Sequence, residues 1–306
     1  MAISKPMLSA LRAMSQSGTD ITKIYKFHRQ FKNLTPIIVD ANKCEVEDID
    51  FFVKDHNVLL RKFIPKGVDI RGVLLFIHGG GWAVDSAQTY TTCCANLSIA
   101  TEHIIISIDY RLAPEYKFPA GFEDCYAVAK ELYSNGFFYN INPEEITLIG
   151  DSAGGNLAAA ISLRARDEKL FQIPRQILIY PSVGYDYSVH SPFKSVIENG
   201  ENYLLTRKKI AGYKELYMDS EEDIHNPYFA PLRAKDFSNQ PKTLIITAEF
   251  CPLRDEGEYY GHLLEENGNS VEIHRITDAI HGYFSLPPSF KMVSKTYDII
   301  NEFLMK

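Results

Sequence analysis

The sequence predicts an α/β protein built on a mostly parallel sheet of about eight strands, with helices on its faces. Two observations lead to this prediction. Short runs rich in Val, Ile and Leu alternate with segments of helical periodicity, which is the pattern of βαβ units. Most of these runs are apolar throughout, as expected of strands that are covered on both faces. Active loops then belong at the carboxyl ends of the strands.

The individual elements follow from the same patterns. Alternating residues at 45–54 and 57–63 predict an antiparallel pair that turns around Asp55. Continuous apolar runs predict strands at 73–77, 103–108, 146–149, 176–180, 243–247 and 271–276. Helical spacing predicts helices at 89–100, 121–134, 156–167, 256–267 and 289–305.

Two segments do not follow this alternation. Residues 1–34 place apolar residues such as Met7, Leu8, Leu11 and Met14 at roughly helical spacing, which predicts one or two amphipathic helices. Residues 183–236 interrupt the alternation and are rich in Tyr, Phe and Leu. We therefore expect a single domain over residues 1–306, with a helical cap formed by about 1–40 and about 183–236.

Composition limits the class of function. The 306 residues are 45% hydrophobic and 23% charged, which is ordinary for a globular protein. The net charge of -7 argues against nucleic acid or an anionic membrane as the main partner. No run of about 18 apolar residues predicts a membrane span, and the N-terminus does not resemble a signal peptide. The oligomeric state is left open, with a homo-oligomer among the options.

The cysteines and glycines also bear on location and cofactors. The five cysteines are odd in number and show no Cys-x-x-Cys spacing, which argues against a disulfide framework or a structural zinc site and favours the cytoplasm. No metal-binding or nucleotide-binding motif is present, because the glycine run at 79–81 is not followed by Gly-Lys-Ser/Thr. We expect neither a metal nor a cofactor.

One turn carries a candidate nucleophile. The apolar run at 146–149 is followed by Gly-Asp-Ser-Ala-Gly-Gly and then by a helix-forming segment. A strand, a Gly-x-Ser-x-Gly turn and a helix describe a nucleophile elbow, which lifts the hydroxyl of Ser152 clear of its neighbours. A Cβ at Gly150 or Gly154 would crowd the backbone of such a turn. The alternative is a plain turn rich in small residues.

Two further stretches follow strands. His78-Gly-Gly-Gly-Trp82 comes directly after the strand at 73–77, and its glycines would let backbone N–H groups approach a ligand, as an oxyanion hole requires. The alternative is a flexible loop. In Asp109–Ala120, DYRLAPEYKFPA, the cation of Arg111 lies between the anions of Asp109 and Glu115, which favours a buried ion-pair network that shapes the loop.

Taken in order, the HGGGW, DYRLAPE and GDSAGG stretches and the segment His281-Gly-Tyr resemble the hormone-sensitive lipase family of α/β-hydrolase esterases. The resemblance covers the chain from about residue 70 to its end. It implies an α/β-hydrolase fold and a serine carboxylic ester hydrolase acting on small-molecule esters. By the same resemblance Ser152 is the nucleophile, His281 is the general base, and Gly80, Gly81 and Ala153 supply the N–H groups of the oxyanion hole.

The sequence departs from this family at the triad acid. Members carry an Asp at the start of an Asp-Pro-Leu-x-Asp-Glu-Gly stretch, and here that position is Cys251. A thiol has a pKa near 8.5 and is a poor partner for the imidazole N–H at pH 7. Among the other carboxylates, Asp278 is the least expected in the family pattern and is the substitute acid that we consider.

Three hypotheses remain open. The protein is an esterase for short-chain acyl esters with a weakened or rearranged triad; or it is a catalytically impaired relative that binds a small molecule, as the gibberellin receptors resemble this family without a full triad; or the cysteine was introduced, naturally or by hand, to silence or probe the site. The natural ester and its acyl length are not predicted.

Overall fold

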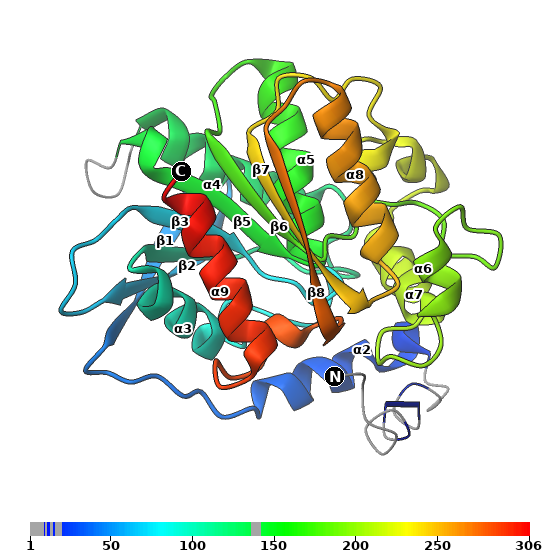
Figure 1. Cartoon of the computed structure of the whole chain (residues 1–306), viewed down its shortest axis with the longest axis horizontal. Helices are drawn as coiled ribbons and strands as arrows, with labels where there is room; N and C mark the ends of the chain where they lie inside the picture. The colour runs from blue at the N-terminus through cyan, green and yellow to red at the C-terminus, as the bar shows by residue number, and fades with distance from the viewer. Residues whose placement is uncertain (1–8, 10, 13–14, 16–19, 136–141) are drawn as a thin grey trace.

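A mixed sheet of eight strands runs through the centre of the molecule (Figure 1). The computed structural model describes residues 9, 11–12, 15, 20–135 and 142–306. The strand order is β1-β2-β4-β3-β5-β6-β7-β8. This arrangement confirms the predicted fold class. The predicted helical positions Met7, Leu8 and Met14 lie outside the described residues.

The antiparallel part of the sheet is a hairpin at one edge. Strands β1 (Cys44–Val53) and β2 (His56–Pro65) pair over their full length around the predicted turn. Strand β2 is also antiparallel to β4, with Leu59 opposite Asp109. Strand β2 therefore runs opposite to both of its neighbours, whereas β1 runs the same way as the other six strands.

The remaining strands are parallel, and all except the edge strand β8 are largely buried. They are β3 (Val73–Ile77), β4 (Ile104–Asp109), β5 (Ile146–Asp151), β6 (Arg175–Ile179), β7 (Lys242–Phe250) and β8 (Val271–Ile280). In β3 and β5 every residue is buried, which agrees with the continuous apolar run of β3 and the mainly apolar start of β5. Because all six run the same way, their carboxyl ends meet at one edge of the sheet.

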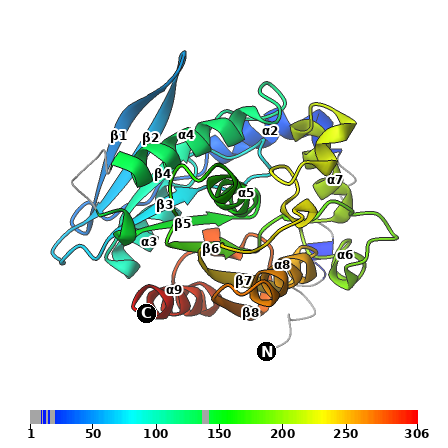
Figure 2. The same cartoon turned by 90° about the horizontal axis from the view of Figure 1, so that it is seen from above.

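Helices cover both faces of the sheet (Figure 2). One apolar core contains residues of α4 (Ala120–Asn135), α5 (Ala153–Glu168) and α8 (Arg254–Glu266). The other contains residues of α3 (Thr91–Thr101) and α9 (Lys291–Leu304). Short 3-10 helices lie at Pro143–Glu145, Glu221–His225, Pro231–Arg233 and Tyr283–Ser285.

Helices α2 (Ile21–Asn33), α6 (Lys194–Glu198) and α7 (Arg207–Tyr217) come from the N-terminal segment and the 183–236 insertion. Helices α2 and α7 are in contact, and a Cβ added at Gly212 would lie only 2.5 Å from the Ile21 side chain. The N-terminal segment and the 183–236 insertion, which are far apart in sequence, thus pack together. No helix among the described residues is long and apolar enough to span a membrane.

The ion pairs of the DYRLAPE stretch differ from the prediction. Arg111 binds Asp124 on α4, with Nη2 and Oδ1 2.7 Å apart, and it does not bridge Asp109 and Glu115. Asp109 accepts the backbone amide of Ala87. Glu115 pairs with Arg29 of α2 at 2.8 Å. The prediction of one three-residue network was wrong because it used only neighbours in sequence, whereas the partners come from helices packed against the loop.

Candidate active site

Ser152 stands on a sharp turn between β5 and α5. Its φ of 56° is a left-handed conformation that an L-residue seldom adopts. The turn is tight: a Cβ at Gly150 would lie 2.3 Å from the Gly154 oxygen, and one at Gly154 would lie 1.9 Å from the Ile77 oxygen. Only glycine fits at both positions. The local sequence therefore permits the strained backbone that carries the serine.

Ser152 faces a histidine brought from the other end of the chain. The Oγ of Ser152 lies 2.9 Å from Nε2 of His281, which follows directly on β8. The other ring nitrogen, Nδ1, lies 3.2 Å from the Sγ of Cys251, which follows directly on β7. Three predicted site residues thus form a continuous chain of contacts at the carboxyl edge of the sheet. The serine–histidine contact has the geometry of a nucleophile and its base.

Burial sets the charge of this chain of residues. Burial lowers the pKa of His281 to about 3, so the imidazole is neutral at pH 7 and has a free nitrogen to receive a proton. Burial also raises the pKa of the Cys251 thiol well above its usual range. The sulfur is therefore a neutral S–H group, without the charge that a carboxylate would place beside the ring.

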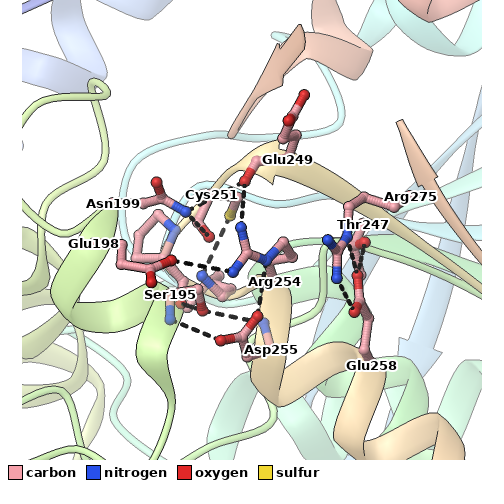
Figure 3. A network of polar contacts seen from close by, with 12 residues as sticks. Ser195, Glu198, Asn199, Thr247, Glu249, Cys251, Arg254, Asp255, Glu258 and Arg275 are labelled. Carbon is pink, nitrogen blue, oxygen red and sulfur yellow. Dashed lines mark hydrogen bonds and ion pairs between the residues drawn. The ribbon is translucent and has the colours of Figure 1, made fainter. Parts of the chain in front are cut away.

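The segment that carries Cys251 is held by several hydrogen bonds (Figure 3). Asn199 Nδ2 donates to the carbonyl oxygens of Glu249 and Cys251, and Arg254 Nη1 donates to the Glu249 oxygen at 3.0 Å. Ser195 Oγ donates to the carbonyl of Pro252. Because these bonds involve the backbone around residue 251, they position its side chain without depending on the sulfur.

The glycine loop lies against the elbow. Gly80 and Gly81 have φ values of 97° and 59°, which glycine adopts without strain. The carboxylate of Asp151 accepts the Gly79 amide at 2.9 Å, and burial raises the pKa of Asp151 to about 7. Among the described residues, no hydrogen bond is donated by the backbone amides of Gly80, Gly81 or Ala153. These three amides are available to a ligand.

A cavity of about 370 Å³ contains the serine, the histidine and the glycine loop. Its walls are mainly apolar, and side chains from α2 and from the segment 204–213 close it, including Leu205, Ile210 and Tyr213. Its polar lining is mixed: His28, Lys32 and Lys209 stand beside the carboxyls of Asp85 and Asp151, and Lys32 pairs with Asp85 at 3.2 Å. No group of His, Cys, Asp and Glu side chains in the described part of the chain could hold a metal ion.

Comparison with known proteins agrees with this geometry. The model of the α/β-hydrolase fold family matches residues 74–285. An arylesterase of Saccharolobus solfataricus is 35% identical over 251 residues, which are 82% of this chain and 80% of the relative. The chain belongs to the α/β-hydrolase fold family, in its hormone-sensitive lipase-like group of esterases.

Two further relatives cover nearly the whole of this hydrolase. An ethyl acetate hydrolase of Pseudomonas putida is 29% identical over 92% of each chain. The solved structure of a hyperthermophilic esterase from the archaeon Pyrobaculum calidifontis has a TM-score of 0.85 and 31% identity, and the match covers 99% of this chain and 98% of that one. The resemblance stated from the four motifs is confirmed.

The hydrolase places Asp278 near the end of β8. Its backbone amide donates to Glu249 Oε2 at 2.7 Å, and its φ is 60°. The Cys251 sulfur lies within hydrogen-bonding distance of His281 Nδ1, at 3.2 Å. The role of Asp278 as a substitute acid stays a prediction.

Sequence reasoning missed residues that support the site of this hydrolase. Asp151 joins the elbow to the glycine loop, and Tyr90 and Tyr180 donate to its second oxygen at 2.9 and 3.3 Å. Asn156, in the first turns of α5, donates to the carbonyls of Ser182 and Phe229. Asp151 and Asn156 stand within the elbow sequence itself, so the polar residues in an otherwise small and apolar stretch were a usable signal. Nothing in the sequence around Tyr90 and Tyr180 indicated their role.

Proposed function

We propose that this protein is a carboxylesterase that hydrolyses short-chain acyl esters through an acyl-enzyme on Ser152, with a weakened triad. The observation that carries the proposal is the 2.9 Å contact between Ser152 Oγ and His281 Nε2 on a strained elbow. Membership of a group of esterases supports the reaction class. The predicted esterase activity agrees with the names of these relatives.

The reaction follows from the positions of the groups. His281 Nε2 takes the hydroxyl proton while Ser152 Oγ attacks the ester carbonyl carbon, and the amides of Gly80, Gly81 and Ala153 donate to the resulting oxyanion. His281 then gives its proton to the alkoxide as the bond between carbon and the alcohol oxygen breaks. In the second half a water molecule loses a proton to His281, attacks the acyl carbon and releases the acid, and Ser152 recovers the proton.

Cys251 weakens this cycle in two ways. Its neutral sulfur gives little stabilisation to the imidazolium that forms when His281 accepts the proton. A thiol can also donate its S–H to Nδ1, which leaves the proton of the neutral ring on Nε2 and turns that nitrogen into a donor toward Ser152. A carboxylate would accept from Nδ1–H and favour the productive tautomer. We therefore propose slow turnover that is least impaired for activated esters.

The cavity supports a short acyl chain or a small alcohol. Its volume of about 370 Å³ is at the small end of the usual range for ligand pockets. The name of the ethyl acetate hydrolase relative agrees with a small ester. We also propose that α2 together with the 183–236 insertion is the cap over this cavity, because α2, Leu205 and Tyr213 line it. The five cysteines are all free and buried, which supports a cytoplasmic location.

Hydrolysis of p-nitrophenyl acetate, butyrate and octanoate tests the proposal. We expect a measurable rate for the protein as it stands, a preference for the two shorter chains, and loss of turnover in Ser152→Ala. Equal rates for the protein and Ser152→Ala would refute esterase activity. If Cys251→Asp were fast at the same time, the fold and site would be sound, and this chain would fit the alternative of a catalytically impaired binding protein.

A further inference from the structure

We propose that α2 and the segment after it, residues 21–38, dock the protein on an anionic lipid surface. This stretch presents an apolar face to solvent. Phe27, Phe31 and Leu34 are 63%, 66% and 80% exposed, and their spacing of four and three residues places them on one side of a helix. Ile38, which follows on the same segment, is 70% exposed. A helix of a globular protein normally turns such a face toward the core.

A different face of α2 attaches it to the protein. Ile21 is buried and lies against Gly212 of α7. Arg29 donates from Nη2 to the carbonyl of Ala113 at 2.6 Å and pairs with Glu115. The helix is therefore fixed through this face, and the phenylalanines face away from these contacts. Their exposure follows from how the helix is held.

The charge of this stretch indicates which kind of partner binds its exposed face. Residues 21–39 contain four cations and no acidic residue, although the whole chain has a net charge of -7. Arg29 and Lys32 pair with Glu115 and Asp85, so the charge offered to a partner is that of the exposed Lys23, which lies 3.7 Å from Asp20, and Lys26. Basic side chains beside exposed Phe and Leu are the composition of helices that lie in an anionic membrane interface. A second copy of this chain, paired through the same face, would bring a second set of cations against the first. Charge complementarity thus favours anionic lipid over self-association.

The position of α2 connects this surface to the cavity. His28 and Lys32, on the same helix as the two phenylalanines, line the cavity that contains Ser152 and His281. Docking through Phe27 and Phe31 would bring this wall of the cavity to the lipid. The net charge alone argued against an anionic membrane as the main partner, because it averages a local basic segment with acidic residues elsewhere.

Sedimentation of the full chain with lipid vesicles tests the proposal. Vesicles of phosphatidylcholine alone are compared with vesicles of phosphatidylcholine and phosphatidylglycerol in equal parts, at low and at physiological salt. The variants are F27S/F31S, K23Q/K26Q and, as a matched control, F52S. Phe52 is 78% exposed on β1 and lies outside the basic segment. Circular dichroism and hydrolysis of p-nitrophenyl acetate check that each variant is folded.

We expect binding to the anionic vesicles only, with each α2 variant weakening it by about tenfold or more and F52S leaving it unchanged. Equal binding to both kinds of vesicle, or binding that survives F27S/F31S, would overturn the proposal. So would light scattering that finds a dimer of the protein alone which F27S/F31S dissociates, because the face would then be a contact between two copies. None of these results depends on whether Ser152 turns over esters.

Discussion

Replacing Cys251 by Asp changes one contact at the centre of the candidate site. The sulfur lies 3.2 Å from His281 Nδ1, and a carboxylate at that distance would accept the Nδ1–H and carry a charge. The neighbouring segment is held by hydrogen bonds that do not involve the sulfur. The substitution therefore alters charge and tautomer preference while it leaves the backbone in place.

The magnitude follows from the distance. Two unit charges 3.2 Å apart in an effective dielectric of about 20 attract each other by about 5 kcal/mol. That attraction would carry the pKa of His281 from about 3 to about 7. If the whole attraction lowered the activation free energy, the rate would rise by about 10⁴, which is similar to the loss that follows removal of the acid from a serine hydrolase triad. Desolvation of the new carboxylate subtracts from it, so we expect an increase of about a hundredfold to a thousandfold.

The pH dependence of kcat/KM provides the assay, because it reports the ionisation of the free enzyme. Only neutral His281 can accept a proton, and its pKa of about 3 means that the protein as it stands keeps its activity as pH falls from 8 to about 5. In Cys251→Asp the pKa is higher, so we expect activity to fall below about pH 7.

Cys251→Asn is the matched control for shape, since its amide resembles the carboxylate without the charge. We expect it to show neither the faster rate nor the acid limb. The reasoning fails if Cys251→Asp is no faster than the unchanged protein, or if Cys251→Asn gains as much as Cys251→Asp.

Four further substitutions test the supporting structure and the substitute acid. Gly154→Ala would place a Cβ 1.9 Å from a backbone oxygen of β3; we expect a loss of about 3 kcal/mol or more in urea unfolding, and a smaller loss for Gly155→Ala, whose nearest atom is 3.0 Å away. Arg111→Met removes the arginine from the fully buried Asp124 carboxylate, which keeps His56 Nε2 at 2.7 Å and the backbone amide of residue 111, and should cost about 1–3 kcal/mol by the same method. Asp278→Asn tests the predicted substitute acid: if Asp278 orients His281, ester hydrolysis should fall by about tenfold or more, and a change of less than about threefold would exclude it from that role.

The sequence predicted the structure best where a residue pattern is compatible with a single local conformation. The apolar run at 73–77 is fully buried and forms β3 within the predicted bounds. The elbow was equally readable, because glycine at 150 and 154 allows a close approach of backbone atoms. Helix α5 begins three residues before the predicted start, at Ala153. Helix propensity disfavours Gly154 and Gly155, and the close packing of Gly154 against Ile77 of β3 and of Gly155 against Pro181 outweighs that preference.

Partners distant in sequence could not be predicted in this way. Arg111 binds Asp124, a contact that depends on how α4 packs against the loop after β4. The exposure of the apolar face of α2 could not be predicted either, because helical spacing identifies an apolar side without saying whether it contacts the core or the solvent. The structure was needed to show that the side chains of Phe27 and Phe31 are exposed to solvent.

The contacts of Cys251 explain how the candidate site holds its geometry with a thiol beside His281. The sulfur is fully buried, accepts the Leu253 amide at 3.4 Å and reaches His281 Nδ1. It therefore takes over part of the hydrogen bonding of a carboxylate without the charge. Because Ser152 Oγ still lies 2.9 Å from His281 Nε2, ground-state geometry is no measure of the activity of this triad. The thiol does not stabilise the imidazolium as a carboxylate would. This deficit affects the transition state, in which His281 accepts the proton, and not the ground state.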